Sequence, residues 1–410
     1  MTTATHTLST CGSAFPSLRR MVEGRPLAFF DGPSGTQVPQ LVIDAISNYY
    51  SQCNANVHGE YITSRESDQI IHETRKRVAI FLGAPSWQEV SFGANMTSLA
   101  FSLSRALART MKQGDEVVIT QLDHEDNRGP WLALAEAGVT IKEVAMHPDG
   151  SLDPEDLARK IGPRTRLVAI GYASNALGTV NDLALARRLS KTVGAWMLVD
   201  AVGAAPHFVI DMAALDADFL LCSAYKWYGP HVGVLYARAG LLEELPTQRL
   251  RTQNPAAPFR IETGTLNHAA LAGVGAAVEF LAGYGEGATL RERLVCTMNA
   301  LEAQERALAM SYYDQVRAIP GVIVWGPDFS GGRRAPTVSI TVKGVNSHEL
   351  ARRLGEGGVA VGDGHFYAAR CIEVLGLENQ GGVVRAGMSM YTQAEDVRRL
   401  VDGVAAVVRG

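Results

Sequence analysis

The feature of this sequence that most constrains its fold is an alternation of short apolar runs with helix-like segments between residues 90 and 236. The segments expected as strands, in chain order, are 90–95, 116–120, 140–145, 166–171, 196–200, 217–222 and 232–236, and most of them are near-continuous apolar runs. Segments with apolar residues at helical spacing, such as Met96–Lys112 and Leu183–Thr192, separate most of them. Strands that are apolar throughout are typical of a parallel sheet covered by helices on both faces. The pattern therefore predicts an α/β fold with a mostly parallel sheet.

Residues unusual for a strand, most of them polar, lie at the ends of five of these segments or shortly after them. In chain order they are Ala94 with Asn95, His124, Asn175, Asp200, and Ser223 to Lys226. Each one alone is more simply interpreted as a turn or helix-capping residue. Ligands of parallel sheets, however, bind outside the carboxyl ends of the strands. Five such positions in succession favour a binding site at that edge.

Lys226 lies in a polar turn between two apolar runs, with Tyr225 before it and Trp227 after it. Burial lowers the pKa of a lysine and favours the free amine. A free amine in a cleft can form a Schiff base with an aldehyde. An ordinary loop lysine is the alternative, and this stretch alone does not choose between the two.

These residues together provide every group that one cofactor needs. Asp200, at the end of a buried strand, can keep a pyridine nitrogen protonated, and Lys226 can hold an aldehyde as an imine. Backbone amides at a helix start, with the Ser223 hydroxyl, can bind a phosphate. His124 can stack on a ring. The cofactor that combines these groups is pyridoxal 5'-phosphate.

Several stretches, taken in order, resemble a known family. They are Asn56–His58, Ser174–Thr179, Leu198–Ala201, Ser223–Pro230, Glu262–Thr265 and Val384–Tyr391. They resemble the fold-type I, class V aminotransferase family, and most closely its cysteine desulfurase-like branch, which also contains isopenicillin N epimerase-like proteins. The resemblance implies a large pyridoxal-phosphate-binding domain with a mostly parallel seven-stranded sheet between helices. It also implies a smaller α+β C-terminal domain and a homodimer with shared active sites.

Position by position, the resemblance also implies residue roles. Lys226 is expected to hold the cofactor and move the proton at Cα, Asp200 to pair with the pyridine nitrogen, and His124 to stack on the ring. The other residues expected to bind the cofactor are Ala94, Asn95, Asn175, Ser223, Tyr225 and, from a neighbouring subunit, Thr265.

The same resemblance implies that Arg385 binds the substrate carboxylate, with Asn175 and His58 also at the substrate. A planar guanidinium suits this two-pronged task better than an ammonium group does. An ordinary surface arginine on a strand remains the alternative for Arg385.

The sequence departs from the desulfurase pattern at two places. Desulfurases carry a cysteine on a mobile loop, and the matching segment Gly362–Tyr367 places Phe366 there, with Cys371 further on. The family's additional arginine in this segment is missing as well. Gly203 stands where related enzymes often have a glutamine or histidine that bonds the phenolic oxygen of the cofactor. A persulfide mechanism is therefore not expected.

We expect a pyridoxal-phosphate-dependent enzyme that acts at Cα or Cβ of an amino acid, with β-elimination by a C–S type lyase as the first choice. Transamination and epimerisation are rival reactions. A doubly wound nucleotide-binding protein is a second class, but no G-x-G-x-x-G follows a strand, and Gly273–Gly275 lies in a helical run. A non-catalytic cofactor-binding protein is a third, and the presence of both Lys226 and Arg385 argues against it.

The predicted organisation is an N-terminal arm (1–25), a large domain (26–285) and a small domain (286–410). The net charge of −4 and the lack of a basic patch argue against nucleic-acid and membrane partners. The start, 1–12, does not have the pattern of a secretory signal, and no apolar run is long enough to span a bilayer. The five cysteines are scattered without a C-x-x-C pair, which argues against disulfides or a metal site and fits the cytoplasm.

Overall fold

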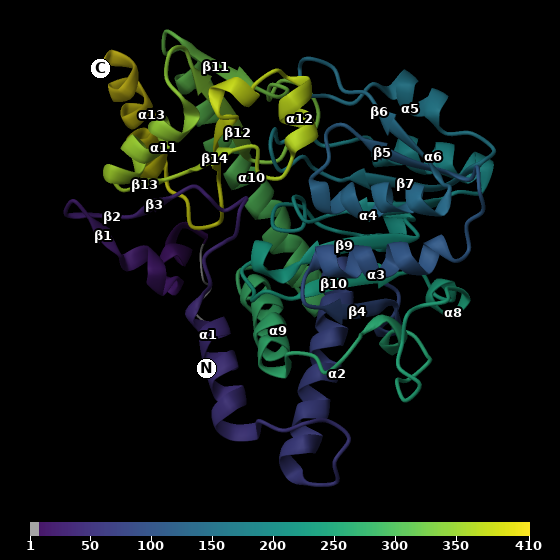
Figure 1. Cartoon of the computed structure of the whole chain (residues 1–410). Coiled ribbons are helices and arrows are strands. Elements are labelled where there is room, and N and C mark those ends of the chain that lie inside the picture. Colours follow the sequence, from purple (N-terminus) through teal and green to yellow (C-terminus); the bar gives the residue numbers. More distant parts are fainter. Residues whose placement is uncertain (1–7) are drawn as a thin grey trace.

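A seven-stranded sheet forms the centre of the larger part of the molecule (Figure 1). The computed structural model describes residues 8–410. The strands are β4 (Val90–Gly93), β5 (Glu116–Thr120), β6 (Thr140–Val144), β7 (Thr165–Gly171), β8 (Trp196–Asp200), β9 (Phe219–Ser223) and β10 (Gly233–Ala237), in the order β4-β10-β9-β8-β7-β5-β6. β10 is antiparallel to both of its neighbours and the other neighbouring pairs are parallel. Six strands therefore point the same way, which confirms the predicted mostly parallel sheet.

Helices cover both faces of this sheet. The helices of this part of the chain are α1 (Gln40–Asn48), α2 (Ile62–Leu82), α3 (Met96–Ala108), α4 (Gly129–Leu132), α5 (Pro154–Lys160), α6 (Leu183–Val193), α7 (Met212–Leu215), α8 (Leu241–Glu244) and α9 (His268–Ala282). Among them, α1 packs against α9. Successive strand residues pack into different cores: Val118 joins one cluster, and Val117 and Ile119 join the other. Because side chains alternate between the faces of a strand, a strand buried on both faces has to be apolar throughout.

A smaller antiparallel sheet follows the long helix α10 (Leu290–Arg317), whose last turns pack into the core through the buried Tyr312 and Val316. Its strands are β11 (Val322–Trp325), β12 (Thr337–Val342), β15 (Val383–Gly387) and β14 (Gly362–Gly364), in that order, with helices α11 (Ser347–Glu356), α12 (Ala369–Val374) and α13 (Ala394–Arg409). The sequence did not predict β14 or α12. β14 contains two glycines, which are uncommon in strands, so its sequence gives no strand signal. It forms a strand because it pairs with β15.

The N-terminal segment joins both parts of the molecule. β3 (Ala28–Phe29) pairs in parallel with β13 (Val359–Ala360). Ahead of β3 are short 3-10 helices at Leu8–Ala14 and Pro16–Arg19, with strands β1 (Met21–Val22) and β2 (Arg25–Pro26). Phe15 is fully buried in the core of the larger part, so this polar segment packs against the body of the protein. Residues 1–7 of the predicted arm lie outside the described residues, and the domain boundaries stay a prediction.

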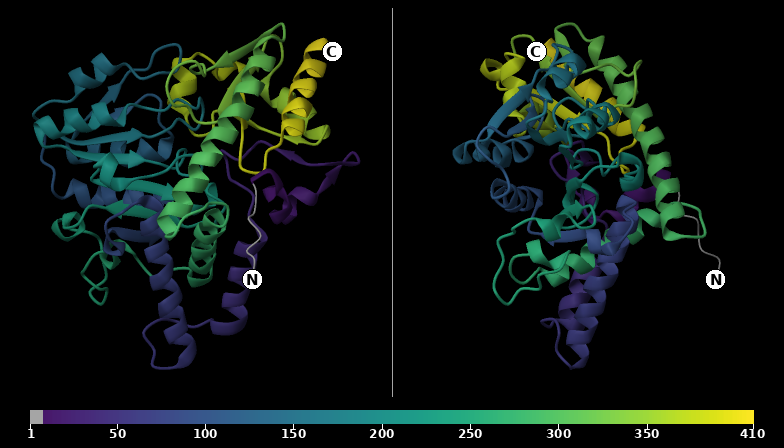
Figure 2. Two further views of the ribbon diagram at one scale, coloured as in Figure 1. Left: turned by 180° about the vertical axis from the view of Figure 1, so that it is seen from behind. Right: turned by 90° about the vertical axis from the view of Figure 1, so that its right-hand side faces the viewer.

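Helix α1 and the first half of α2 project from the body of the molecule (Figures 1 and 2). Large apolar side chains on this projection are exposed to solvent, and they are Leu41, Ile43, Tyr50, Tyr61 and Ile62. No helix among residues 8–410 is both long and apolar enough to cross a bilayer.

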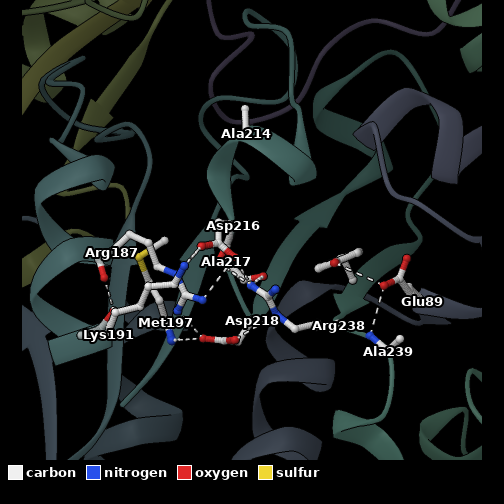
Figure 3. A network of polar contacts seen from close by, with 12 residues as sticks. Glu89, Arg187, Lys191, Met197, Ala214, Asp216, Ala217, Asp218, Arg238 and Ala239 are labelled. Atoms are coloured by element: carbon white, nitrogen blue, oxygen red, sulfur yellow. Dashed lines mark hydrogen bonds and ion pairs between the residues drawn. The ribbon is translucent and has the colours of Figure 1, made fainter. Parts of the chain in front are cut away.

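A network of charges holds the sheet edge opposite to the carboxyl ends of the parallel strands (Figure 3). Asp218, just before β9, accepts hydrogen bonds from the Met197 amide at 2.8 Å, from Arg187 at 2.8 Å and from Arg238 at 3.1 Å. Asp216 pairs with the same two arginines and with Lys191. These contacts connect α6, β8, β9 and the end of β10. They fix the positions of β8 and β9 relative to each other, and with them the carboxyl ends of these strands.

Candidate active site

A small enclosed cavity lies between the carboxyl ends of the parallel strands and residues Gly32 and Pro33 of the N-terminal segment, with a volume of about 40 Å³. Five of the predicted site residues line it: His124, Asn175, Asp200, Tyr225 and Lys226. They follow four different strands, β5, β7, β8 and β9. The structure therefore brings together the polar residues that follow successive strands, as the position of ligand sites in parallel sheets predicts.

The amine of Lys226 points to the loop that closes this cavity. Its Nζ donates hydrogen bonds to the carbonyl oxygens of Pro33 and Ser34, the latter at 3.1 Å. Burial and the nearby Arg385 lower the pKa of Lys226 to about 8, although nearby carboxylates oppose this shift. The free amine, which is the form that attacks an aldehyde, is thus accessible near neutral pH.

Asp200 lies at the end of β8 and is 7% exposed. Its Oδ1 accepts a hydrogen bond from the Val202 amide at 2.8 Å. Burial, followed by the charge of Asp126, raises the pKa of Asp200 well above its usual value. A buried carboxyl group in this state is stabilised by a cationic N–H partner, which is what a protonated pyridine nitrogen supplies.

His124 and Asn175 flank the cavity from the ends of β5 and β7. The Nδ1 of His124 accepts a hydrogen bond from the Asp126 amide at 3.0 Å and lies 2.7 Å from the Asp126 carboxylate. The Asn175 Nδ2 donates to the Phe366 carbonyl oxygen at 2.8 Å. The Asn175 Oδ1 is buried and has no hydrogen-bond partner among residues 8–410, so it can still accept a hydrogen bond from a ligand.

Asn95 and Ser223 lie at the start of helix α3. The Asn95 side chain accepts from the Ser98 amide at 2.8 Å, and the Ser223 hydroxyl accepts from the Met96 amide at 3.0 Å. These are helix-capping contacts, the role that sequence alone left open for Asn95. A phosphate bound at this helix start would use the same amides, so it would take the place of the caps.

Six predicted residues do not line the Lys226 cavity within one chain, and they are His58, Ala94, Asn95, Ser223, Thr265 and Arg385. Ala94 and Thr265 line a separate cavity of about 360 Å³, together with His231. His58 and Thr265 line a wider hollow of about 550 Å³. The ring of His231 stacks on Tyr225 at 4.6 Å, which places this second cavity beside the Lys226 turn. Burial raises the pKa of Tyr225 to about 12, so its hydroxyl keeps its proton and can donate to a phosphate.

Arg385 is not a surface arginine. Its residue is 1% exposed on β15, and its guanidinium donates to the Asn175 carbonyl oxygen at 2.9 Å. The ring of Phe366 covers one face of the guanidinium, 3.8 Å from its carbon. Arg385 is therefore held next to Asn175, a predicted site residue that follows strand β7 of the larger sheet.

Sequence reasoning assigned no role to several residues at this site. Asp123, Asp126 and His207 line the cavity, and Asp31 pairs with Arg385 at 3.2 Å. Burial raises the pKa of Asp123 to about 7. The strand-end rule that found His124 also applies to Asp123 and Asp126, whereas Asp31 and His207 carry no such local signal. Among residues 8–410, no group of three or more His, Cys, Asp or Glu side chains is arranged to hold a metal ion.

A cavity at the carboxyl edge of a mostly parallel seven-stranded sheet, lined by a lysine and a buried aspartate, defines a fold-type I pyridoxal-phosphate enzyme. Residues 28–400 match the model of the family Aminotransferase class-V. The chain belongs to this family of pyridoxal-phosphate-dependent enzymes, which confirms the resemblance seen in the sequence and the expected cofactor.

The relatives and solved structures similar to this chain include several cysteine desulfurases. A cysteine desulfurase of Escherichia coli (strain SE11) is 32% identical over 416 residues, covering 96% of this chain and 97% of that protein. The apo structure of cysteine desulfurase from Thermococcus onnurineus NA1 has a TM-score of 0.86 at 28% identity, covering 97% and 98% of the two chains. The cysteine desulfurase CsdA of Escherichia coli has a TM-score of 0.87 at 26% identity, covering 99% of both.

Proposed function

We propose that this protein is a pyridoxal-phosphate-dependent lyase that eliminates a leaving group from Cβ of an amino acid, in a reaction of the C–S type, without a protein persulfide. The observation that supports it best is the convergence of Lys226, Asp200, His124 and Asn175 on one cavity that no cysteine lines. The similarity to cysteine desulfurases supports chemistry at the same carbon atoms.

The residues divide the work as follows. When bound, the cofactor would supply a sink for the electron pair left at Cα. Lys226 holds the aldehyde carbon and then carries the Cα proton, for which a pKa of about 8 is well matched to neutral pH. Asp200 keeps the ring nitrogen protonated, and Arg385 holds the substrate carboxylate. His124 covers the ring.

The cysteines explain why we propose direct release of the leaving group. Of the five free cysteines, Cys11, Cys53, Cys222 and Cys371 are buried, and only Cys296 is exposed. Burial raises the pKa of Cys371, the cysteine nearest in sequence to the Gly362–Tyr367 segment, to about 12. A thiol of that pKa is a poor nucleophile at neutral pH because little thiolate is present.

The loop that contains Gly32 and Pro33 bears on how the cofactor enters. It forms one wall of the cavity, and the carbonyl oxygens of Pro33 and Ser34 hold the Lys226 amine. Lys226 has to give up at least one of these contacts to hold the cofactor. We therefore expect this loop to move outward when the cofactor binds.

The partner that we propose is a second copy of the chain. Its packing on the α1–α2 projection would bury Leu41 and Ile62, which are 50% and 65% exposed in the single chain. A second copy would also account for Thr265 and His58, which do not line the Lys226 cavity of their own chain. The double variant Leu41→Asp with Ile62→Asp is expected to be monomeric by light scattering. Ile323→Asp, at an equally exposed apolar site on β11, is the control and is expected to remain dimeric.

Product analysis tests the reaction. The purified protein is incubated with a panel of amino acids, including L-cysteine, and keto acid, ammonia and sulfide are measured separately. Elimination gives keto acid and ammonia in equal amounts without an amino acceptor. An aminated cofactor that needs an acceptor identifies transamination, and racemised substrate without ammonia identifies epimerisation; either result rejects the lyase.

A separate measurement tests whether a cysteine of the protein takes up sulfur as a persulfide. Intact-mass spectrometry after reaction with L-cysteine is expected to show no added sulfur, and Cys296→Ser is expected to keep full activity. A sulfur adduct on any cysteine would contradict direct release. The scattered free cysteines also fit a reducing compartment, and the cytoplasm stays the predicted location.

A further inference from the structure

The guanidinium of Arg385 already has a carboxylate partner within the chain. Its Nη2 donates to Asp31 Oδ1 at 3.2 Å and to Ser34 Oγ at 2.6 Å. Its Nη1 donates to the Asn175 carbonyl oxygen at 2.9 Å. The Ser34 hydroxyl in turn donates to Asp31 Oδ1 at 2.7 Å, so Asp31, Ser34 and Arg385 form a closed triangle of polar contacts.

The geometry of a guanidinium makes this arrangement exclusive. A carboxylate binds arginine in a two-pronged way across two neighbouring N–H groups. Two edges allow this, Nη1 with Nη2 and Nε with Nη2, and both include Nη2. The two hydrogens of Nη2 are given to Asp31 and Ser34. A substrate carboxylate that binds Arg385 by either edge therefore has to displace one of them.

We propose that Asp31 is an internal competitor for the substrate carboxylate at Arg385, and that it thereby sets the affinity of the site for amino acids. This inference rests on the carboxylate-binding role of Arg385 in the proposed function. Asp31 rather than Ser34 is displaced for two reasons. Its contact with Nη2 is the longer one, and its negative charge repels an incoming carboxylate. The side chain of Asp31 is 28% exposed, while that of Arg385 is 1% exposed. Asp31 can therefore turn towards water while Arg385 stays in place.

Asp31 also stabilises the folded protein as the counter-charge of Arg385. A buried arginine without a counter-charge is strongly unfavourable, and burial lowers the pKa of Arg385 to about 10 even with Asp31 beside it. Asp31 thus stabilises the protein whenever no substrate carboxylate is bound. The same loop holds the Lys226 amine through the carbonyl oxygens of Pro33 and Ser34. Release of Asp31 therefore loosens the loop that contacts both Lys226 and Arg385.

The test compares the holoenzyme of wild type with Asp31→Asn. Two constants are measured: the KM of an amino acid that is turned over, and the inhibition constant of propionate, a carboxylate without an amino group. If Asp31 occupies Arg385 most of the time, its neutralisation lowers both constants about five- to tenfold, because the competent fraction rises. The kcat should stay within about twofold, and the melting temperature without ligand should fall. Unchanged or higher constants would overturn the proposal, since a residue that merely orients Arg385 would weaken binding when neutralised.

Two further variants keep the outcome clear. Arg385→Lys is expected to raise both constants; if it leaves them unchanged, the carboxylate-binding role of Arg385 is wrong, whatever Asp31→Asn does. Asp182→Ala removes an exposed helix cap, the contact to the Leu185 amide at 2.8 Å, and lowers stability without altering propionate inhibition. If Asp31→Asn does not fold, Asp31→Ser, which keeps a small polar group, is measured in its place.

Discussion

Arg75 and Glu262 form a buried two-pronged ion pair, with N–O distances of 2.6 and 3.1 Å. The same Glu262 carboxylate accepts a hydrogen bond from the Phe92 amide at 2.7 Å, and Arg75 also donates to the Val90 carbonyl oxygen at 2.6 Å. The pair joins helix α2, strand β4 and the turn that leads to Thr265. Glu262 belongs to a stretch that the sequence marked as a family motif, and its contacts give it a structural task.

Replacement of Glu262 by Gln is expected to lower the free energy of unfolding by about 3 kcal/mol, because it leaves the Arg75 charge buried without a counter-charge. Urea unfolding followed by circular dichroism measures this change. Glu279→Gln is the matched control, since Glu279 pairs with Arg77 at the surface and exposed pairs contribute about 0–1 kcal/mol. Equal effects of the two substitutions would contradict the account of the buried pair.

Replacement of Lys226 by Ala is expected to abolish the imine absorbance band that wild-type protein shows with saturating pyridoxal 5'-phosphate. Lys226 is the amine that lines the cavity, and no other side chain can form the imine there. Absorbance spectra of the two dialysed proteins provide the measurement. Lys76→Ala, a change at an exposed lysine paired with Glu73, should keep the band. A band that persists in the Lys226→Ala protein would reject the assignment.

The rate of cofactor capture is expected to rise with pH and to level off above about pH 8. Burial and Arg385 lower the pKa of Lys226 to about 8. Below this pH the protonated amine, which is unreactive towards an aldehyde, dominates, so the rate falls by about tenfold for each pH unit. Stopped-flow absorbance at constant ionic strength measures this profile. A rate that keeps rising to pH 10 would mean that Lys226 titrates like an exposed lysine.

Gly203 is expected to tolerate no side chain. A Cβ atom at this position would lie 2.7 Å from the Ala173 carbonyl oxygen, which is closer than such atoms approach. Gly203→Ala should therefore lower the free energy of unfolding by about 1–3 kcal/mol and weaken cofactor binding, because Gly203 also lines the cavity.

Gly162→Ala is the control for that substitution, since nothing lies within 4 Å of a Cβ built there. Thermal unfolding and equilibrium dialysis with the cofactor measure both effects. If both alanine variants behaved like wild type, the close approach at Gly203 would have no energetic consequence. The same contact explains why a glutamine or histidine side chain does not fit here without a shift of the backbone.

The sheet and the cavity-lining residues were predictable because their signals are local. Each parallel strand of the sheet except β6, which carries Lys142 and Glu143, is a largely apolar run of its own, and the chain leaves it through a polar turn. The carboxyl ends of parallel strands must meet at one edge, so His124, Asn175, Asp200 and Lys226 had to come together once the strands paired. Strand β14 lacked such a signal, since a glycine-rich segment becomes a strand only when β15 lies beside it.

By itself, the sequence determined the α/β class and the family. It also showed which strand ends carry the polar site residues, including the lysine that holds the cofactor in the proposed function. Only the tertiary structure decided which partners share the buried charges. Asp31 contacts Arg385 across 354 positions of the chain, and Glu262 contacts Arg75 across 187. The physical reason is that apolar periodicity acts over neighbouring residues, whereas a buried charge takes its partner from whichever distant segment the completed fold brings within hydrogen-bonding distance.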